Sequence, residues 1–107
     1  MGVRIGRLRR RVRIEAKCVE RNEYGEEIIT WQPVATVWAA VEALRGRELT
    51  ERKAEGADIT TRIVIRYRDG IRPSMRVVWE EHVYDIQSVI PSARREWIEV
   101  LATEVER

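Results

Sequence analysis

A chain of 107 residues is long enough for one modest hydrophobic core, so we expect a single domain over residues 1–107. It contains no apolar run near the roughly 18 residues of a membrane span, and no apolar segment follows the arginine-rich start as in a signal peptide. The net charge is only +2 although 36% of the residues are charged, so overall charge does not argue for a nucleic-acid partner. The one cysteine, Cys18, rules out an internal disulfide and fits a reducing cytosol.

Alternation of apolar and polar residues predicts short strands along most of the chain. We expect these strands at residues 11–19, 28–44, 59–68, 75–81, 82–90 and 95–105. The first run places Val12, Ile14, Ala16 and Cys18 on one face. Pro33 restricts the second run to a sheet edge, a bulge or a break. The last run alternates less cleanly, which indicates that both of its faces are partly covered.

Buried positions follow from the same alternation. The residues expected in the core are Val12, Ile14, Ile63, Ile65, Val77 and Ile86. About six short strands with few helical signals favour an all-β fold, either a small barrel or a sandwich. A parallel sheet would need a helical crossover between successive strands, and only one connection is long enough for that.

That connection spans residues 45–58 and is rich in charge. Glu48 and Arg52 have the i, i+4 spacing of a helical ion pair, and Gly56 is a residue type that ends helices. The apolar residues Leu44, Leu49, Ala54 and Ala57 do not form a stripe. We therefore expect a mobile loop with one or two helical turns. Excursions of this length from small domains are usually functional.

Few residues in the chain suggest catalysis. His82 lies at an expected hairpin turn, and no nucleophile is specified beside it. Cys18 lies on the apolar face of the first strand, where a thiol is usually an inert core group. One cysteine and one histidine do not make an ordinary zinc site. The pairs Glu26/Glu27 and Glu80/Glu81 fit solvated turns. We expect no catalytic residue, no metal site, no cofactor and no enzymatic activity.

The arginines near the start fit two interpretations. The cluster comprises Arg4, Arg7, Arg9, Arg10, Arg11 and Arg13. It is suited to phosphates or to an acidic protein surface, but it also fits the solvated face of a strand. A barrel that binds single strands would need exposed aromatic side chains, whereas Tyr67 and Tyr84 fall in register with core residues. The tryptophans favour core or interface positions over stacking with bases; they are Trp31, Trp38, Trp79 and Trp97.

Several short motifs, in order, resemble those of the phage head–tail joining family, whose members are also called head-closure or stopper proteins. The motifs extend from about residue 6 to residue 101 and read "GRLRRRVRI", "YGEEIITW", "VWA", "GRE", "IRYRDGIRPSMR" and "YDIQSV". The final run, "WIEVLATEV", departs from the family pattern in being more acidic. The resemblance implies a small β-barrel of about six strands with a long, partly helical inserted loop.

It also implies a non-enzymatic virion protein of a phage or prophage, present in the host cytoplasm before assembly. Such proteins form a ring, commonly of twelve subunits, beneath the portal or adaptor. The ring closes the DNA exit channel after packaging and offers the tail a docking surface. Partners would therefore be further copies of the chain, the portal or adaptor ring, tail-completion proteins and, by non-specific contact, the packaged DNA. The alternative is a cytosolic β-barrel that binds nucleic acid as a monomer.

Two groups of residues follow as candidates for these roles. We expect the arginines at the start to dock rather than to stabilise the monomer, namely Arg7, Arg9, Arg10 and Arg11. The resemblance assigns channel gating to the loop at about 45–58, whose charged residues are Arg45, Arg47, Glu48, Glu51, Arg52, Lys53 and Glu55. A charged, weakly patterned segment of this kind is suited to ordering on assembly.

Overall fold

Each alternating run of the sequence contains a strand, because period-two patterning lets one face of a sheet become buried. The computed structural model describes residues 8–54 and 58–105. In this part of the chain six strands and one helix follow in the order β1 (Arg10–Arg21), β2 (Glu27–Ala43), α1 (Gly46–Ala54), β3 (Thr61–Arg66), β4 (Arg76–Trp79), β5 (His82–Pro91) and β6 (Trp97–Val105). The predicted all-β class with a partly helical insertion is confirmed.

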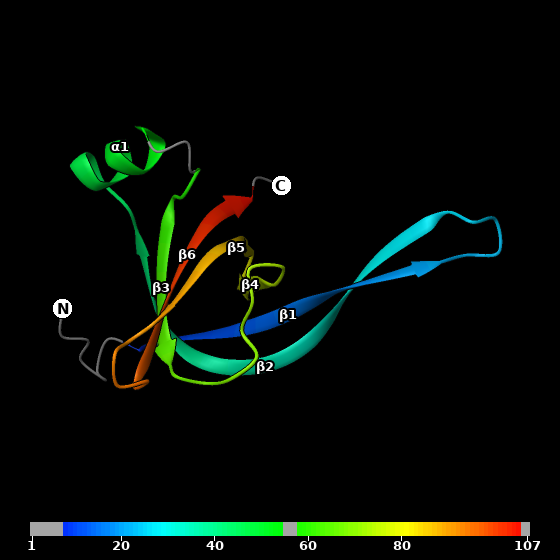
Figure 1. Ribbon diagram of the computed structural model, residues 1–107, viewed down its shortest axis with the longest axis horizontal. Coiled ribbons are helices and arrows are strands. Elements are labelled where there is room, and N and C mark those ends of the chain that lie inside the picture. The colour runs from blue at the N-terminus through cyan, green and yellow to red at the C-terminus, as the bar shows by residue number, and fades with distance from the viewer. Residues whose placement is uncertain (1–7, 55–57, 106–107) are drawn as a thin grey trace.

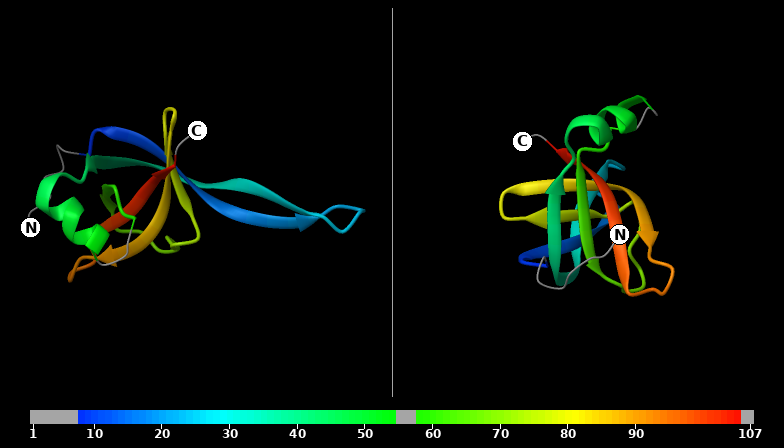
Figure 2. Two further views of the ribbon diagram at one scale, coloured as in Figure 1. Left: turned by 90° about the horizontal axis from the view of Figure 1, so that it is seen from above. Right: turned by 90° about the vertical axis from the view of Figure 1, so that its left-hand side faces the viewer.

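The strands pair antiparallel in the order β1-β2-β3-β6-β5-β4 and close into a barrel. The ring closes where β4 pairs with β1, over three residue pairs that run from Arg13↔Val78 to Glu15↔Arg76. Figure 2 shows the barrel from two sides, with α1 beyond one end of β2 and β3. Of the barrel and the sandwich that patterning allowed, the chain forms the barrel.

The core lies inside this ring. All six residues expected there are buried, with exposed fractions between 0% for Val12 and 3% for Ile86. They pack with further buried residues from the same faces, which are Ala39, Tyr84, Ile98, Val100 and Ala102. The predicted registers of these strands are therefore confirmed.

Smaller apolar clusters cover the outside of the barrel. Leu101 of β6 packs with Leu44 and Ile59, and Leu49 of α1 lies against them. On another side, Leu8 packs with Ala40 and Val64, with Trp97 beside them. These clusters explain why the last strand alternates poorly, since apolar residues are needed on both of its faces.

The longest projection from the barrel is a two-stranded arm, not the connection at 45–58. β1 and β2 pair along their whole length, from Arg10↔Ala39 to Arg21↔Glu27. β4 covers β1 only at residues 13–15, and β3 covers β2 only at residues 39–43. Residues 16–21 and 27–34, together with the turn between them, therefore form an arm that extends the molecule to 51 Å against 30 and 26 Å in its other directions (Figure 1).

A bulge marks the point where the arm leaves the barrel. Ile14 pairs with Ala35 while Glu15 pairs with Pro33, so Val34 is an extra residue in β2. Pro33 thus occupies a bulge, one of the three positions open to it. The inward alternation of β1 holds as far as Ile14, but Cys18 lies on the arm and is only half-buried. The expectation that Cys18 is a core residue is wrong, because the barrel ends before it.

Candidate interaction surfaces

The arm exposes an unusual amount of apolar surface. Of the eight exposed large hydrophobic residues in the described part of the chain, five lie on it, namely Val19, Tyr24, Ile28, Ile29 and Val34. Val19 lies opposite Ile29, and Trp31 lies two positions along the same strand, so these three side chains share one face. A two-stranded ribbon is marginally stable alone, and exposed apolar patches usually mark a contact surface.

A structured turn holds the tip of the arm. The side-chain oxygen of Asn22 accepts hydrogen bonds from the backbone N–H groups of Tyr24, at 2.9 Å, and Glu26, at 3.0 Å. Gly25 adopts a φ of 78°, which favours glycine. Tyr24 is left 79% exposed. The tip is also acidic, since the arm carries four carboxylates and two cations, which are Glu20, Glu23, Glu26 and Glu27 against Lys17 and Arg21.

The base of the arm is fixed by a buried carboxylate. Glu15 is 6% exposed and accepts hydrogen bonds from Nε of Arg13 and Nε of Arg76, each at 2.7 Å. The guanidinium of Arg76 also lies 4.1 Å from the ring centre of Trp31. Burial alone would raise the pKa of the Glu15 carboxyl, but the hydrogen bonds from Arg76 and Arg13 outweigh burial and hold this pKa below its usual value.

A basic hollow of about 280 Å³ lies at the other end of the β1–β2 ribbon, where β3 ends. Its wall is formed by Arg11, Thr36, Val37, Trp38, Arg66, Tyr67 and Arg68. Within the residues that the structure describes, none of the three guanidinium groups has an ion-pair partner, and the buried Nε of Arg68 has no hydrogen-bond partner. Three unpaired guanidinium groups around one hollow are suited to binding carboxylates or phosphates.

Aromatic rings contact two of the three arginines around this hollow. The guanidinium of Arg11 lies 5.1 Å from the ring centre of Trp38, and that of Arg66 lies 5.8 Å from Trp97. The hydroxyl of Tyr67 donates to Asp69 at 2.9 Å, and this hydrogen bond raises the pKa of Tyr67. The two contacts with tryptophan rings limit where the guanidinium groups of Arg11 and Arg66 can point, so the hollow is partly preorganised for an anion.

The described arginines among those predicted to dock do not all line the same hollow. Arg7 lies outside the described residues. Arg9 and Arg10 line a second hollow of about 330 Å³, with Ala40, Val41 and Glu42. The guanidinium of Arg10 lies 4.8 Å from the ring centre of Trp79. Arg11 belongs instead to the basic hollow. Arg66 and Arg68 were not among the candidate docking residues predicted from the sequence. Both alternate with the apolar residues of the run 59–68, so the pattern could have identified them as outward-facing.

The connection predicted to gate a channel forms helix α1, which is tied to the barrel. Nε of Arg62 donates to Glu99 at 3.0 Å, and the same guanidinium binds Glu48 of α1. Burial alone would lower the pKa of Arg62, but the hydrogen bonds that it donates to Glu99 and Glu48 raise this pKa. Leu49 packs against the outer cluster. The sequence showed no apolar stripe in this segment, and among its described side chains Leu49 supplies the packing.

The other charged residues of this connection that were assigned to channel gating are Arg45, Arg47, Glu51, Arg52, Lys53 and Glu55. Arg47 pairs with Glu51 at 3.2 Å on the helix surface, and Arg45 is exposed. Arg52 is partly buried and also has an interaction within the described chain. The side chain of Lys53 and the whole of Glu55 lie outside the described residues. Arg45 and Arg47 are therefore exposed to solvent, whereas Glu48 binds the barrel through Arg62.

The remaining candidate, His82, lies on the surface beside Glu104. His82 is exposed at the start of β5, its Nδ1 3.2 Å from a Glu104 oxygen and its ring stacked on Trp79. Among the described residues, no group of three or more His, Cys, Asp or Glu side chains is placed to hold a metal ion. Over the same residues, no helix has the length and apolar character needed to cross a membrane.

Known proteins share this architecture. The solution structure of protein SF1141 from Shigella flexneri 2a superposes with a TM-score of 0.74 at 32% sequence identity, covering 95% of this chain and 96% of that one. A chain of the virion of a native gene transfer agent particle matches with a TM-score of 0.60 at 19% identity, covering 90% and 94% respectively, which shows a common fold. No curated protein matches the sequence significantly. The profile of the phage head completion proteins matches residues 3–105, and the chain therefore belongs to the phage head completion protein family.

Proposed function

We propose that the protein forms a ring beneath the portal or adaptor of a filled capsid, closes the DNA exit channel and gives the tail its docking surface. Membership of the family establishes a structural role at the phage head. The arm is the observation that supports an assembly role within it. A monomer gains little from a ribbon that carries five exposed apolar residues beyond the barrel, whereas a contact with another subunit would bury them.

The proposed partners are further copies of this chain, the portal or adaptor ring and tail-completion proteins. Arg7, Arg9, Arg10 and Arg11 provide docking contacts, either within the ring or with the portal. Exposed arginines contribute little to a monomer but form strong bidentate bonds with carboxylates in a desolvated interface. The protein has no enzymatic role in this proposal, and packaged DNA is contacted without sequence preference.

Helix α1 and its flanking residues serve as the channel-facing element in this proposal. Among the described residues, Arg62 and Leu49 hold the helix to the barrel, and both contacts would have to change if assembly moved it. The Arg62 side chain is only 15% exposed, but it keeps its hydrogen bond to Glu99 when Glu48 leaves, so a buried charge is not left without a partner by movement of the helix. Its charged outer face suits a position in a DNA-conducting channel.

The proposal is tested by deleting the gene from the phage or prophage that encodes it. We expect capsids that package DNA, fail to retain it and lack tails, and we expect purified protein added to such capsids to restore DNA retention and tail attachment. Deletion capsids that keep their DNA and carry tails would contradict the proposal. The barrel variant Ile63→Ala, which lowers stability without touching either surface, serves as a control for reduced protein level.

The basic hollow favours one other candidate, a module that binds nucleic acid. Arg11, Arg66 and Arg68 lie around it with Trp38, a combination that suits a phosphate beside a stacked base. Binding of a short labelled oligonucleotide by the isolated monomer, with an affinity that falls steeply as salt rises, would support this candidate. Weak binding with a shallow salt dependence favours the assembly role.

A further inference from the structure

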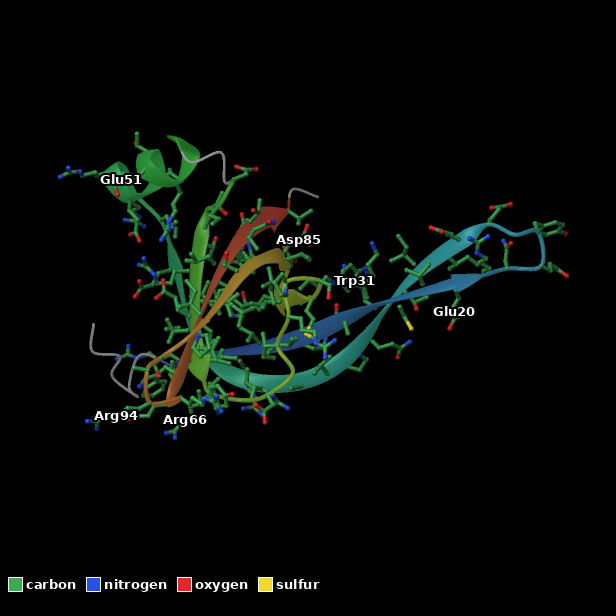
Figure 3. All side chains as sticks on the ribbon, viewed as in Figure 1. Glu20, Trp31, Glu51, Arg66, Asp85 and Arg94 are labelled. Carbon is green, nitrogen blue, oxygen red and sulfur yellow. The ribbon has the colours of Figure 1, made fainter. Side chains whose placement is uncertain are left out.

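The arm and the basic hollow are opposite in charge and lie apart in the molecule. Figure 3 shows Glu20 on the arm at one side and Arg66 at the other, beyond the barrel. Arg11 and Arg21 are ten positions apart on one extended strand, a separation of about 33 Å. The arm therefore cannot reach the hollow of its own chain, and each surface remains available to another molecule.

The two surfaces are complementary. The arm offers carboxylates at its tip and an apolar face formed by Val19, Ile29 and Trp31. The hollow offers three guanidinium groups that have no ion-pair partner among the described residues, and Trp38 beside them is 53% exposed. Carboxylates and guanidinium groups form the strongest charge-assisted hydrogen bonds in proteins, and adjacent apolar residues on both sides allow the contact to exclude water.

We propose that the arm of one copy of this chain docks on the basic hollow of the next copy. Carboxylates of the tip, including the exposed Glu23 and Glu26 of the turn, bind Arg11, Arg66 and Arg68. The apolar face of the arm lies against the exposed Trp38. The inference rests on the ring proposed above and identifies the surfaces that hold neighbouring copies together.

Such a contact joins two different patches, so it is directional and repeats from copy to copy. A repeated contact between unlike patches gives a closed ring when the rotation between copies closes, and an open filament when it does not. A contact made only by a thin arm is weak between two free copies. It becomes strong once the ring closes, because each copy is then held at two places.

A charge-swap experiment tests the contact. The arm variant Glu23→Lys/Glu26→Lys and the hollow variant Arg11→Glu/Arg66→Glu change residues that are exposed and fully placed in the structure. Each variant alone should self-associate at least about tenfold more weakly than the wild type, because like charges then meet at every contact. An equimolar mixture should associate again, since the reversed arm meets the reversed hollow while the native arm meets the native hollow.

Association is measured by sedimentation velocity up to about 1 mM protein at low salt, the condition that favours charged contacts. Glu81→Lys, an exposed reversal in the β4–β5 turn, is the control and should associate like the wild type. Failure of the mixture to recover, or a wild type that stays monomeric throughout, would overturn the inference. The inference would also be overturned if the hollow variant self-associated normally but no longer bound the portal, because the portal would then be the partner that occupies the hollow.

The arm variant, the hollow variant and their mixture are also added to capsids that lack this chain, and DNA retention is measured. This experiment distinguishes failure of the arm contact from failure of the proposed function. If the charge swap controls association but neither variant affects DNA retention, the contact exists and the closure role fails. If closure needs the protein but tolerates both reversals, the closure role holds and the arm contact fails. Restoration of closure only by the mixture supports both.

Discussion

Glu15 and Arg76 are 61 positions apart in the chain, and their side chains meet at 2.7 Å across the seam where β4 closes the barrel onto β1. Only three residue pairs form this seam. The ion pair therefore reinforces the least extensive strand contact of the barrel, and it also fixes the base of the arm through Arg76 and Trp31.

The first prediction concerns pH. The pKa of Glu15 is lowered in the folded protein, so its contribution to stability is present above the usual glutamate pKa, about 4.3. That contribution is lost as the pH falls through the lower folded-state pKa. Glu15→Gln should lower the free energy of unfolding at pH 7 by about 1–3 kcal/mol. Denaturant unfolding from pH 7 to pH 3 should show the difference between the two proteins shrinking, and a constant difference would contradict this assignment.

The second prediction concerns the core. Ile63→Ala or Ile65→Ala should each lower the free energy of unfolding by about 2–5 kcal/mol, because both side chains are buried inside the barrel. Ile28→Ala on the arm is a matched control, since Ile28 is 44% exposed, and its effect should stay within about 0.5 kcal/mol. Urea unfolding monitored by tryptophan fluorescence measures all three. Equal effects at positions 28 and 63 would show that the arm is buried in solution.

The third prediction concerns helix α1. Its amides should exchange with solvent faster than those of β3 and β6, because a nine-residue helix outside the barrel has less support than strands that are paired on both sides. Glu48→Ala should accelerate exchange within the helix and leave the barrel strands unchanged. Arg47→Ala removes a surface pair and serves as the control. Exchange as slow in α1 as in β6 would exclude a helix that moves on assembly.

The fourth prediction concerns the arginines at the start of β1. Reversal of Arg9 and Arg10 to glutamate should change the melting temperature by no more than a few degrees, because exposed charges and cation–π contacts contribute about 1 kcal/mol or less each. The same protein should fail to restore DNA retention in capsids that lack the wild type. A large drop in melting temperature would instead assign these arginines to folding, and full restoration would exclude docking.

The fifth prediction concerns the arm itself. Deletion of residues 18–30, with Asn-Gly joining Lys17 to Trp31, replaces the outer arm by a two-residue hairpin turn. The barrel should still fold with a melting temperature within a few degrees of the wild type, because the removed residues pair only with one another. Self-association should be lost. Loss of folding would show that the outer arm belongs to the folded core of the monomer.

The barrel register was predictable, but the arm was not. Alternation identifies Ile63 and Ile65 as core residues because one face of a strand must be apolar to be buried. The same alternation continues through Ala16 and Cys18, yet nothing in it reveals whether a third strand pairs there. Pro33 was compatible with a sheet edge, a bulge or a break. Only the observed pairing of Glu15 with Pro33 shows that it occupies a bulge.

The basic hollow needed the topology as well. Arg11, Trp38 and Arg66 come from three strands, and they meet because β2 lies between β1 and β3. The sequence shows each residue as outward-facing without showing that they are neighbours. The packing of α1 also depends on the topology. Leu49 packs against a cluster that contains Leu101 of β6, and the sequence does not show that these two residues are neighbours.

The difference between the two ends of the molecule has a consequence for any ring that they build. Copies joined arm to hollow all face the same way around the ring, so no twofold axis lies in its plane. The two rims of such a ring are chemically unlike. A connector between a capsid and a tail needs this property, because it must present one rim to each of two different structures.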